Sequence, residues 1–255
     1  MLAPSLDEGR IDYDAISTQY DGFRGISAEL VDVIVTEARL SQGARILDVG
    51  CGTGTIDVML EKRLNAAIIG VDRSLGMLTA ARAKLSEGRW IHADSAALPL
   101  RSDTFDCVLM LYVLHHMADF SVAIREAHRL LRSGALVILT ASHEQIESSF
   151  ASRFFPSYAA LDKARFPKVG AIAAAMKEAG FTDVARRSVT VAKVTFDEHY
   201  LEKVRNKHVS TYLLISEDEF RHGFERMCSY VAEHAGEPPL NHEGTLIVGR
   251  KKEFH

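Results

Sequence analysis

A short apolar run that leads straight into three glycines constrains this chain more than any other feature. The run from Arg45 to Val49 is rich in β-branched and aliphatic residues, which predicts a buried strand. Gly50, Gly52 and Gly54 follow, and apolar residues then recur at helical spacing as far as Leu64. Glycines permit a tight turn and leave no Cβ between the backbone and a ligand. The helix after the turn points its free amide groups at the same space, so the stretch predicts a binding loop.

Strands and helices alternate regularly around this loop. The pattern predicts strands at 67–71, 90–93, 105–112 and 135–141, with helices at 29–40, 75–85 and 120–131. Ser27 and Ser74 are placed to cap two of these helices, and Ser133-Gly134 is expected to end a third. This alternation predicts a parallel sheet with helices on both faces. The loops after the strands then share one edge of the sheet, where such folds bind ligands.

The pattern changes after residue 141. An aromatic-rich connection at 142–168 is followed by a helix at 169–179 and a β-branched strand at 182–195. Residues 197–235 are again helical, with Ser216 and Glu219 forming an expected capping box, and a last strand covers 244–248. The aromatic residues between 150 and 166 are expected to serve packing, with a substrate box as the alternative.

Composition excludes several classes of protein. The 255 residues carry a formal net charge of −4, so no basic field invites nucleic acid. The three cysteines form no C-x-x-C pair, which argues against a disulfide scaffold or a cysteine metal site and favours the cytoplasm. The N-terminal residues do not resemble a signal peptide, and the longest apolar stretch, 107–114, is too short to span a bilayer. We therefore expect no bound metal and no membrane partner.

The glycine pattern is G-x-G-x-G, because Thr55 stands where a dinucleotide fingerprint would place its third glycine. It heads a series of blocks that read L-D-V-G-C-G-T-G, G-V-D-R-S-L-G-M-L, H-A-D-S-A-A-L-P-L, F-D-C-V-L-M-L-Y-V-L-H-H and R-L-L-R-S-G. In order and spacing, from about residue 12 to 141, the chain resembles the class I S-adenosylmethionine-dependent methyltransferases. It is similar to the broad group that includes quinone-ring and natural-product enzymes.

The resemblance implies one methyltransferase domain over residues 1–255. Its α/β fold would be a Rossmann-like, seven-stranded, mostly parallel sheet with helices on both faces and an antiparallel last strand. The family usually joins its last two strands tightly, whereas roughly 48 residues intervene here. We therefore expect a helical cap at 197–235, with 142–168 as a second cap insertion and residues 1–40 as an N-terminal lid.

The resemblance also implies S-adenosyl-L-methionine as the cofactor and assigns residues to it. Gly50 and Gly52 would meet the methionine part, and Asp72 would accept hydrogen bonds from the ribose hydroxyls. Arg24, within a Y-D-x-x-R lid motif, could clasp the cofactor carboxylate as a charge-assisted pair. The alternatives are purely structural roles: Asp72 could cap a helix, Asp94 could form a turn and Arg24 could be a surface residue. The implied set is Tyr20, Arg24, Asp48, Gly50, Gly52, Asp72, Arg73, Met77, Asp94, Ser95 and Leu111.

Catalytic and substrate residues are less marked. One residue of the His115-His116 pair could face the site as a base, although adjacent helical residues point in different directions and make a poor metal site. We take His116 and Tyr20 as the catalytic candidates. In the expected cap, Arg205 or His208 could hold an acidic group of the substrate, with a solvated helix face as the alternative.

These features predict methyl transfer from S-adenosylmethionine to a small-molecule acceptor. The acceptor atom stays open among oxygen, nitrogen, carbon and sulfur, and so does the oligomeric state. The sequence L-Y-V-L follows the fourth strand in place of the N-P-P-Y type, which disfavours adenine and protein amides as acceptors. A non-catalytic module that keeps the cofactor motifs is the first alternative, and an NAD-dependent oxidoreductase is the second.

Overall fold

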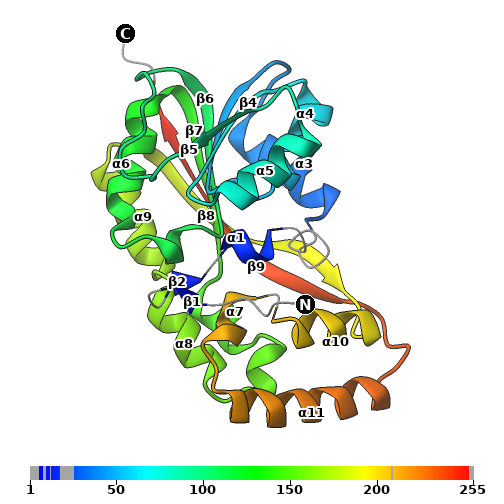
Figure 1. Cartoon of the computed structure of the whole chain (residues 1–255). Coiled ribbons are helices and arrows are strands. Elements are labelled where there is room, and N and C mark those ends of the chain that lie inside the picture. The colour runs from blue at the N-terminus through cyan, green and yellow to red at the C-terminus, as the bar shows by residue number, and fades with distance from the viewer. Residues whose placement is uncertain (1–5, 8–9, 12, 18–25, 208, 253–255) are drawn as a thin grey trace.

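A seven-stranded sheet forms the centre of the molecule in the computed structural model, which describes residues 6–7, 10–11, 13–17, 26–207 and 209–252 (Figure 1). The strand order is β5-β4-β3-β6-β7-β9-β8, and β9 runs antiparallel to both of its neighbours. The other pairings are parallel, which confirms the predicted fold class. The strands are β3 (Arg45–Val49), β4 (Ala67–Asp72), β5 (Arg89–His92), β6 (Phe105–Leu111), β7 (Leu131–Thr140), β8 (Thr182–Val194) and β9 (Leu240–Lys251).

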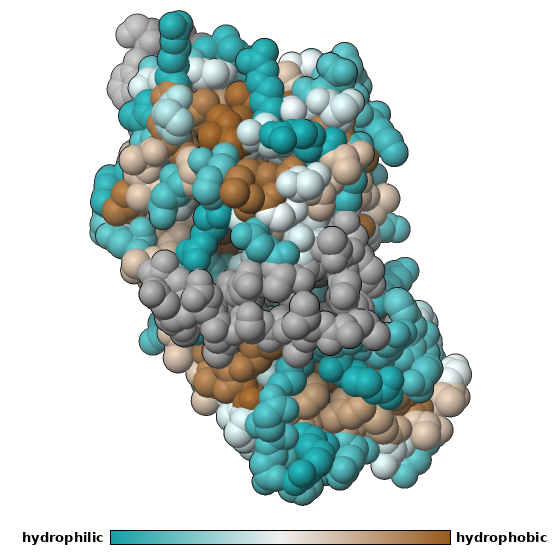
Figure 2. Space-filling model, in the orientation of Figure 1, coloured by the Kyte–Doolittle hydropathy of each residue, from teal (hydrophilic) through white to brown (hydrophobic). Residues whose placement is uncertain are grey.

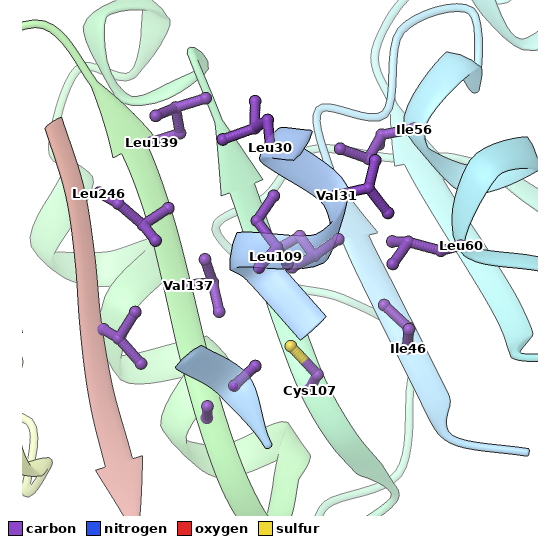
Figure 3. Packing of buried hydrophobic residues seen from close by; sticks show 14 of the residues in the cluster. Leu30, Val31, Ile46, Ile56, Leu60, Cys107, Leu109, Val137, Leu139 and Leu246 are labelled. Atoms are coloured by element: carbon purple, nitrogen blue, oxygen red, sulfur yellow. The ribbon is translucent and has the colours of Figure 1, made fainter. Parts of the chain in front are cut away.

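Helices cover both faces of the sheet. On one face α3 (Ala28–Ala38) and α4 (Thr55–Leu64) bury their apolar side chains against β3, β6 and β7, as Figure 3 shows, and α5 (Leu75–Lys84) lies beside α4. On the other face α6 (Phe120–Leu130) and α9 (Val169–Glu178) close a second apolar core. No helix in the described part of the chain is long and apolar enough to cross a membrane.

Helix caps at the expected positions fix where two of these helices begin. Ser27 Oγ accepts a hydrogen bond from the Leu30 amide at 3.1 Å, and Ser74 Oγ accepts one from the Met77 amide at 3.0 Å. Because α3 buries Leu30 completely in the sheet core, it is part of the central layer. The lid expected over residues 1–40 therefore includes a helix that belongs to the sheet core.

A second group of helices packs beyond the end of the sheet and forms a separate aromatic core (Figure 1). We call it the helical lobe. Phe155 is fully buried there, and Gly223 in α11 (Glu217–Glu233) lets its ring approach, since a Cβ at that glycine would overlap it. The aromatic connection thus serves packing, as expected. The lobe consists of η2 (Ala151–Arg153), α8 (Tyr158–Arg165), α10 (Glu198–Arg205), η3 (Ser210–Leu213) and α11 (Glu217–Glu233), and α7 (His143–Glu147) leads into it.

Three local expectations were wrong. Helix α6 ends at Leu130 and β7 begins at once, so Gly134 lies inside the strand, where it approaches the Asp106 carbonyl too closely for a side chain. Ser216 does cap α11, but Glu219 accepts from the Ser157 amide and closes no capping box. Strand β9 begins at Leu240 because its pairing with β8 extends well beyond the sheet core.

The surface differs between the middle and the ends of the molecule. Figure 2 shows apolar patches in the upper and lower halves of the face that it presents, and mainly hydrophilic side chains at the two ends. At this middle level the short strands β1 (Leu6–Asp7) and β2 (Arg10–Ile11) pair, and α1 (Tyr13–Ile16) follows them (Figure 1). The described N-terminal elements therefore lie between the sheet and the helical lobe.

Candidate active site

A cavity of about 680 Å³ opens at the carboxyl ends of β3, β4, β5 and β6. Such an edge is where open α/β sheets bind their ligands, and this volume falls in the range of about 300–1,000 Å³ for ligand sites. Residues from the helical lobe also line it, so the cavity reaches from the sheet edge to the lobe. The lining includes Tyr13, Gly50, Gly52, Asp72, Arg73, Met77, Asp94, Ser95, Leu111, Tyr112, His115, His116, Arg165 and Leu214.

The glycine loop presents bare backbone to this cavity. Gly50, Gly52 and Gly54 all have positive φ angles, of 78°, 53° and 71°, which residues with side chains rarely adopt. A Cβ at Gly50 would also overlap the Val113 side chain. Space and conformation thus both require glycine at this position, and a ligand can approach the main chain directly.

Asp72 lies at the end of β4, facing the loop. Its Oδ2 accepts a hydrogen bond from the Gly52 amide and its Oδ1 accepts one from the Ser74 amide, each at 2.9 Å. Burial raises the pKa of this carboxyl, although the amides act in the opposite direction. Each carboxylate oxygen has a further lone pair, so Asp72 can still accept two hydroxyl groups from a ligand in the cavity.

Two more carboxyl groups are buried beneath the loop. Asp48 and Asp57 are 2% and 0% exposed, and neither lines the cavity. Burial, together with the charges of Asp57 and Asp72, raises the pKa of Asp48 well above its usual value, and burial raises that of Asp57 to about 7. Cys51 is buried beside them, and burial also raises the pKa of its thiol, as suits a loop filler.

The same cavity is lined by five more of the residues expected near the cofactor: Arg73, Met77, Asp94, Ser95 and Leu111. Met77 is almost fully buried at the start of α5, and Leu111 ends β6. Asp94 follows β5, and its Oδ1 accepts a hydrogen bond from the Ala96 amide at 2.9 Å. Asp94 therefore also forms the turn that we considered as its alternative role, and its other oxygen remains for a ligand.

The two adjacent histidines both line the cavity, whereas we expected only one to do so. They lie in a 3-10 helix, η1 (Leu114–His116), and their ring centroids are 3.9 Å apart. The His115 ring stacks on Phe166 at the end of α8, with centroids 3.9 Å apart. His116 Nε2 lies 2.9 Å from the hydroxyl oxygen of Tyr13 in α1, so a hydrogen bond joins two segments 103 positions apart.

Helix α1 is held in place by the residue after Tyr13. Asp14 Oδ1 accepts hydrogen bonds from the Ser74 hydroxyl and the Gly76 amide, both at 2.6 Å. Asp14 thus provides a negative charge in the first turn of α5, where the helix dipole favours it. These two hydrogen bonds lower the pKa of Asp14, so the contact persists at neutral pH. The contact positions Tyr13 over the cavity.

Comparison with known proteins agrees with this geometry. The family described as "Methyltransferase domain" matches residues 47–139, which include the glycine loop, Asp72, Asp94 and both histidines. A demethylmenaquinone methyltransferase of Staphylococcus aureus is 25% identical over 225 residues, covering 76% of this chain and 93% of that protein. The chain is a class I S-adenosylmethionine-dependent methyltransferase.

Solved structures share the fold of this methyltransferase. A proposed methyltransferase from an antibiotic biosynthesis pathway of Anabaena variabilis superposes with a TM-score of 0.74 at 19% identity, over 89% of this chain and 98% of that chain. The phosphoethanolamine N-methyltransferase 2 of Haemonchus contortus, in complex with S-adenosylhomocysteine, has a TM-score of 0.61 at 17% identity, over 94% of this chain and 58% of that chain.

The cavity fits the cofactor of the methyltransferase. The glycine loop leaves its backbone open, which a bulky sulfonium ligand requires for close approach. Asp72 has acceptor capacity for a ribose, and Met77 and Leu111 provide apolar contact. The cofactor of this methyltransferase is S-adenosyl-L-methionine.

Not every expected residue reaches the cavity. Arg205 lies outside it, with its side chain 56% exposed, 3.7 Å from a Glu198 carboxylate oxygen and over the Phe224 ring. Of the two interpretations, the solvated helix face describes Arg205 and the inward-pointing side chain was wrong, because α10 turns its apolar face, with Leu201 and Val204, to the lobe core. Tyr20, Arg24 and His208 lie outside the described residues.

Sequence reasoning missed several residues that line the cavity, and three of them come from segments outside the sheet edge. Tyr13 is brought there by the docking of α1, while Arg165 and Leu214 come from the helical lobe. An aromatic residue in the N-terminal segment was a weak signal for Tyr13. Nothing local distinguishes Arg165 from the other arginines of the chain.

Proposed function

We propose that the methyltransferase acts on a small-molecule acceptor that loses a proton during the reaction, held between the glycine loop and the helical lobe. The supporting observation is the Tyr13–His116 pair, which lines the same cavity as the glycine loop. In this proposal the lobe is the cap, and the segment before α3 is the lid. A cytoplasmic location, expected from the cysteine pattern, is part of the same proposal.

The cofactor would be held by the strand ends. The loop backbone at Gly50 and Gly52 would bind the amino acid part, and Asp72 would accept the ribose hydroxyls. Arg73 and Met77 would flank the adenine, with Asp94 and Ser95 at its amino edge. Asp48 would support the loop from below, since it is buried behind it. S-adenosylmethionine supplies a methyl group that is already activated by a positively charged sulfur.

With an activated methyl group, the chain's main task is to orient the acceptor, because proximity and alignment supply much of the acceleration. His116 and Tyr13 would take up the proton that the acceptor loses. The Tyr13 oxygen would accept this proton while the Tyr13 hydroxyl passes its own to His116 Nε2, 2.9 Å away. The proton ends on the imidazole, and the electron pair left on the acceptor forms the new bond to carbon. Tyr20 remains a further candidate in the lid.

A proton-accepting pair is useful when the acceptor carries a hydroxyl group or an acidic C–H. The Staphylococcus aureus relative is named for action on demethylmenaquinone, which supports a ring that becomes reactive when a proton leaves. We therefore propose a phenolic or enolic acceptor, methylated on oxygen or on an adjacent carbon.

The test begins with calorimetry of S-adenosylhomocysteine binding, followed by mass-spectrometric detection of methylated products from a panel of phenols, hydroquinones and enols. His116→Ala and Tyr13→Phe should each lower kcat by about 10²–10⁴-fold, the usual contribution of a general base. Both variants should keep nearly the wild-type affinity for S-adenosylhomocysteine. His222→Ala, an exposed histidine on α11, is the matched control. Full activity in both site variants would remove the pair from the mechanism, and methylation of amines alone would overturn the acceptor class.

A further inference from the structure

Arg165 is a cationic side chain that lines the cavity from the side of the helical lobe. It is the last residue of α8, and its side chain is only 20% exposed. The next residue, Phe166, stacks on His115, whose ring adjoins that of His116. Arg165 therefore lies in the part of the cavity that contains the proposed proton-accepting pair.

A network of hydrogen bonds fixes the Arg165 guanidinium. Its Nη2 donates to Asp162 Oδ1 at 2.6 Å, to Thr211 Oγ1 at 3.0 Å and to Ser210 Oγ at 3.2 Å. Thr211 Oγ1 in turn donates to Asp162 Oδ1 at 2.6 Å, and both Asp162 and Thr211 are buried. The arginine is thus pre-oriented by α8 and η3, which reduces the entropy that binding would cost.

This network uses only one of the three guanidinium nitrogens. Nε is buried and has no acceptor, and Nη1 forms no hydrogen bond, among the residues that the structure describes. A guanidinium carries five N–H donors, and leaving donors without acceptors in a buried site is costly. A purely structural role, in which Arg165 joins α8 to η3, explains the hydrogen bonds of Nη2. This structural role does not explain why a cationic side chain lines the cavity. It also does not explain why the Nη1 donors have no hydrogen-bond acceptor among the described residues.

We propose that Arg165 binds a carboxylate on the methyl acceptor, so that the substrate class is hydroxylated organic acids. A carboxylate matches guanidinium geometry and forms short, charge-assisted hydrogen bonds. The acid end would lie at Arg165 and the hydroxyl end at Tyr13 and His116, which fixes the direction in which the acceptor enters. This inference rests on the proposed function. It assigns to α8 the task that sequence reasoning assigned to Arg205.

The experiment uses matched probes on the protein saturated with S-adenosylhomocysteine. Calorimetry compares 4-hydroxybenzoate, 3,4-dihydroxybenzoate and 4-hydroxyphenylacetate with their methyl esters. The wild type should bind at least one acid about tenfold more tightly than its ester. In Arg165→Gln this preference should fall to about twofold or less, while Arg165→Lys should keep part of it. For any pair that is turned over, the change should appear in KM more than in kcat.

Two controls separate recognition from stability. Thr211→Val removes one acceptor of the network but keeps the guanidinium, so it should lower the melting temperature and preserve the preference for acids. Arg205→Gln removes an arginine from the outer face of the same lobe and should leave the preference unchanged. Esters that bind as tightly as the acids, or a complete lack of acid binding, would overturn the inference.

The outcomes for this inference and for the proposed function can be told apart. Methylation of neutral phenols alone would leave the proposed function intact and reject the carboxylate site. Acid binding that depends on Arg165, without any methyl transfer, would support the carboxylate site and reject the proposed function.

Discussion

The sheet half of the molecule and the helical lobe bury charged groups in different ways. Beneath the glycine loop, Asp48 and Asp57 are buried without a cationic partner in direct contact within the described residues, and burial raises the pKa values of both. In the lobe, Oδ1 of the buried Asp162 lies 2.6 Å from Arg165 Nη2 and forms an ion pair with it. Buried carboxyl groups without such a partner tend to hold a proton. Within the described residues, the sheet half thus buries carboxyl groups beneath the loop without an ion pair, whereas the lobe holds its buried carboxyl group in an ion pair with Arg165.

The two regions also differ in their cores. The sheet buries aliphatic residues in two layers, while the lobe depends on stacked and edge-to-face aromatic rings. The lobe is connected to the sheet through β8 and β9, which extend past the sheet core. Under the proposed function the two regions divide the work, because the sheet edge would bind the cofactor and the lobe would complete the acceptor site.

The largest expected effect tests this division directly. Phe155→Ala removes a fully buried ring from the lobe core and should lower the free energy of unfolding by about 3–5 kcal/mol. Denaturant titration measures this loss, and Phe105→Ala in the sheet core is the matched substitution. Acceptor turnover should drop in Phe155→Ala while the folded protein keeps its affinity for S-adenosylhomocysteine. Loss of that affinity would show that the two regions do not work separately.

A second substitution should affect the sheet half alone. Gly50→Ala introduces a Cβ that overlaps Val113 at a φ of 78°, and we expect affinity for S-adenosylhomocysteine to fall by about a hundredfold, or about 2.7 kcal/mol. Gly43→Ala is the control, because its φ is 73° but its Cβ would meet nothing within 4 Å. It shares the conformational cost of about 1–2 kcal/mol without the collision. Equal affinity losses in the two variants would rule out the collision as the cause.

The buried carboxyl groups predict a pH dependence. Unfolded Asp57 ionises near pH 4, whereas in the folded protein it keeps its proton until about pH 7. The folded state binds more protons between these values, so this group makes the free energy of unfolding fall as pH rises from about 4 to about 7. Asp57→Asn should gain stability over the wild type at pH 8, by about 1.4 kcal/mol for each unit by which the pKa is raised, and little at pH 4. Thermal melts across this pH range measure the gain, and Asp32→Asn, at an exposed carboxyl on α3, is the matched substitution of a surface carboxylate.

The smallest expected effect concerns the contact between α1 and α5. Gly76→Ala would place a Cβ 2.8 Å from Ser17 Oγ and 3.0 Å from the Asp14 Cα atom, which should displace Tyr13 and lower kcat severalfold. Gly170→Ala is matched to it, since both glycines are the second residue of a ten-residue helix and a Cβ at Gly170 meets nothing within 4 Å. There the helix propensity of alanine should stabilise the protein by up to about 1 kcal/mol without changing kcat. A Gly76→Ala enzyme with normal kcat would refute the positioning role of α1.

The sequence predicts the sheet half well because its signals are local. A strand of five residues, three glycines and an acid at the next strand end suffice to place Gly50 and Asp72 at one edge. The junction of α6 and β7 was wrong by a few residues, since Ser133-Gly134 has the composition of a helix stop but is accommodated in the strand next to Asp106. Tertiary contact decided that boundary.

The lobe side of the site could not be predicted for the opposite reason. Arg165 acquires its orientation from residues 45 and 46 positions later in the chain, and Tyr13 acquires its partner 103 positions away. Arg205 lies among basic residues in the sequence, which made it a candidate for the cavity. Because α10 packs its apolar face against the lobe core, Arg205 points to the outside. Which arginine enters the cavity depends on how three short helices pack, and no spacing rule contains that information.

The docking of α1 has a consequence for the timing of each catalytic cycle. Tyr13 lies over the cavity and belongs to the proposed proton-accepting pair, and Asp14 secures both to the first turn of α5. If α1 lifts to let a molecule enter or leave, the pair separates in the same movement. Exchange of ligands and chemistry would then exclude one another in time, so an open enzyme is an inactive one and the reaction can begin only after the entrance has closed.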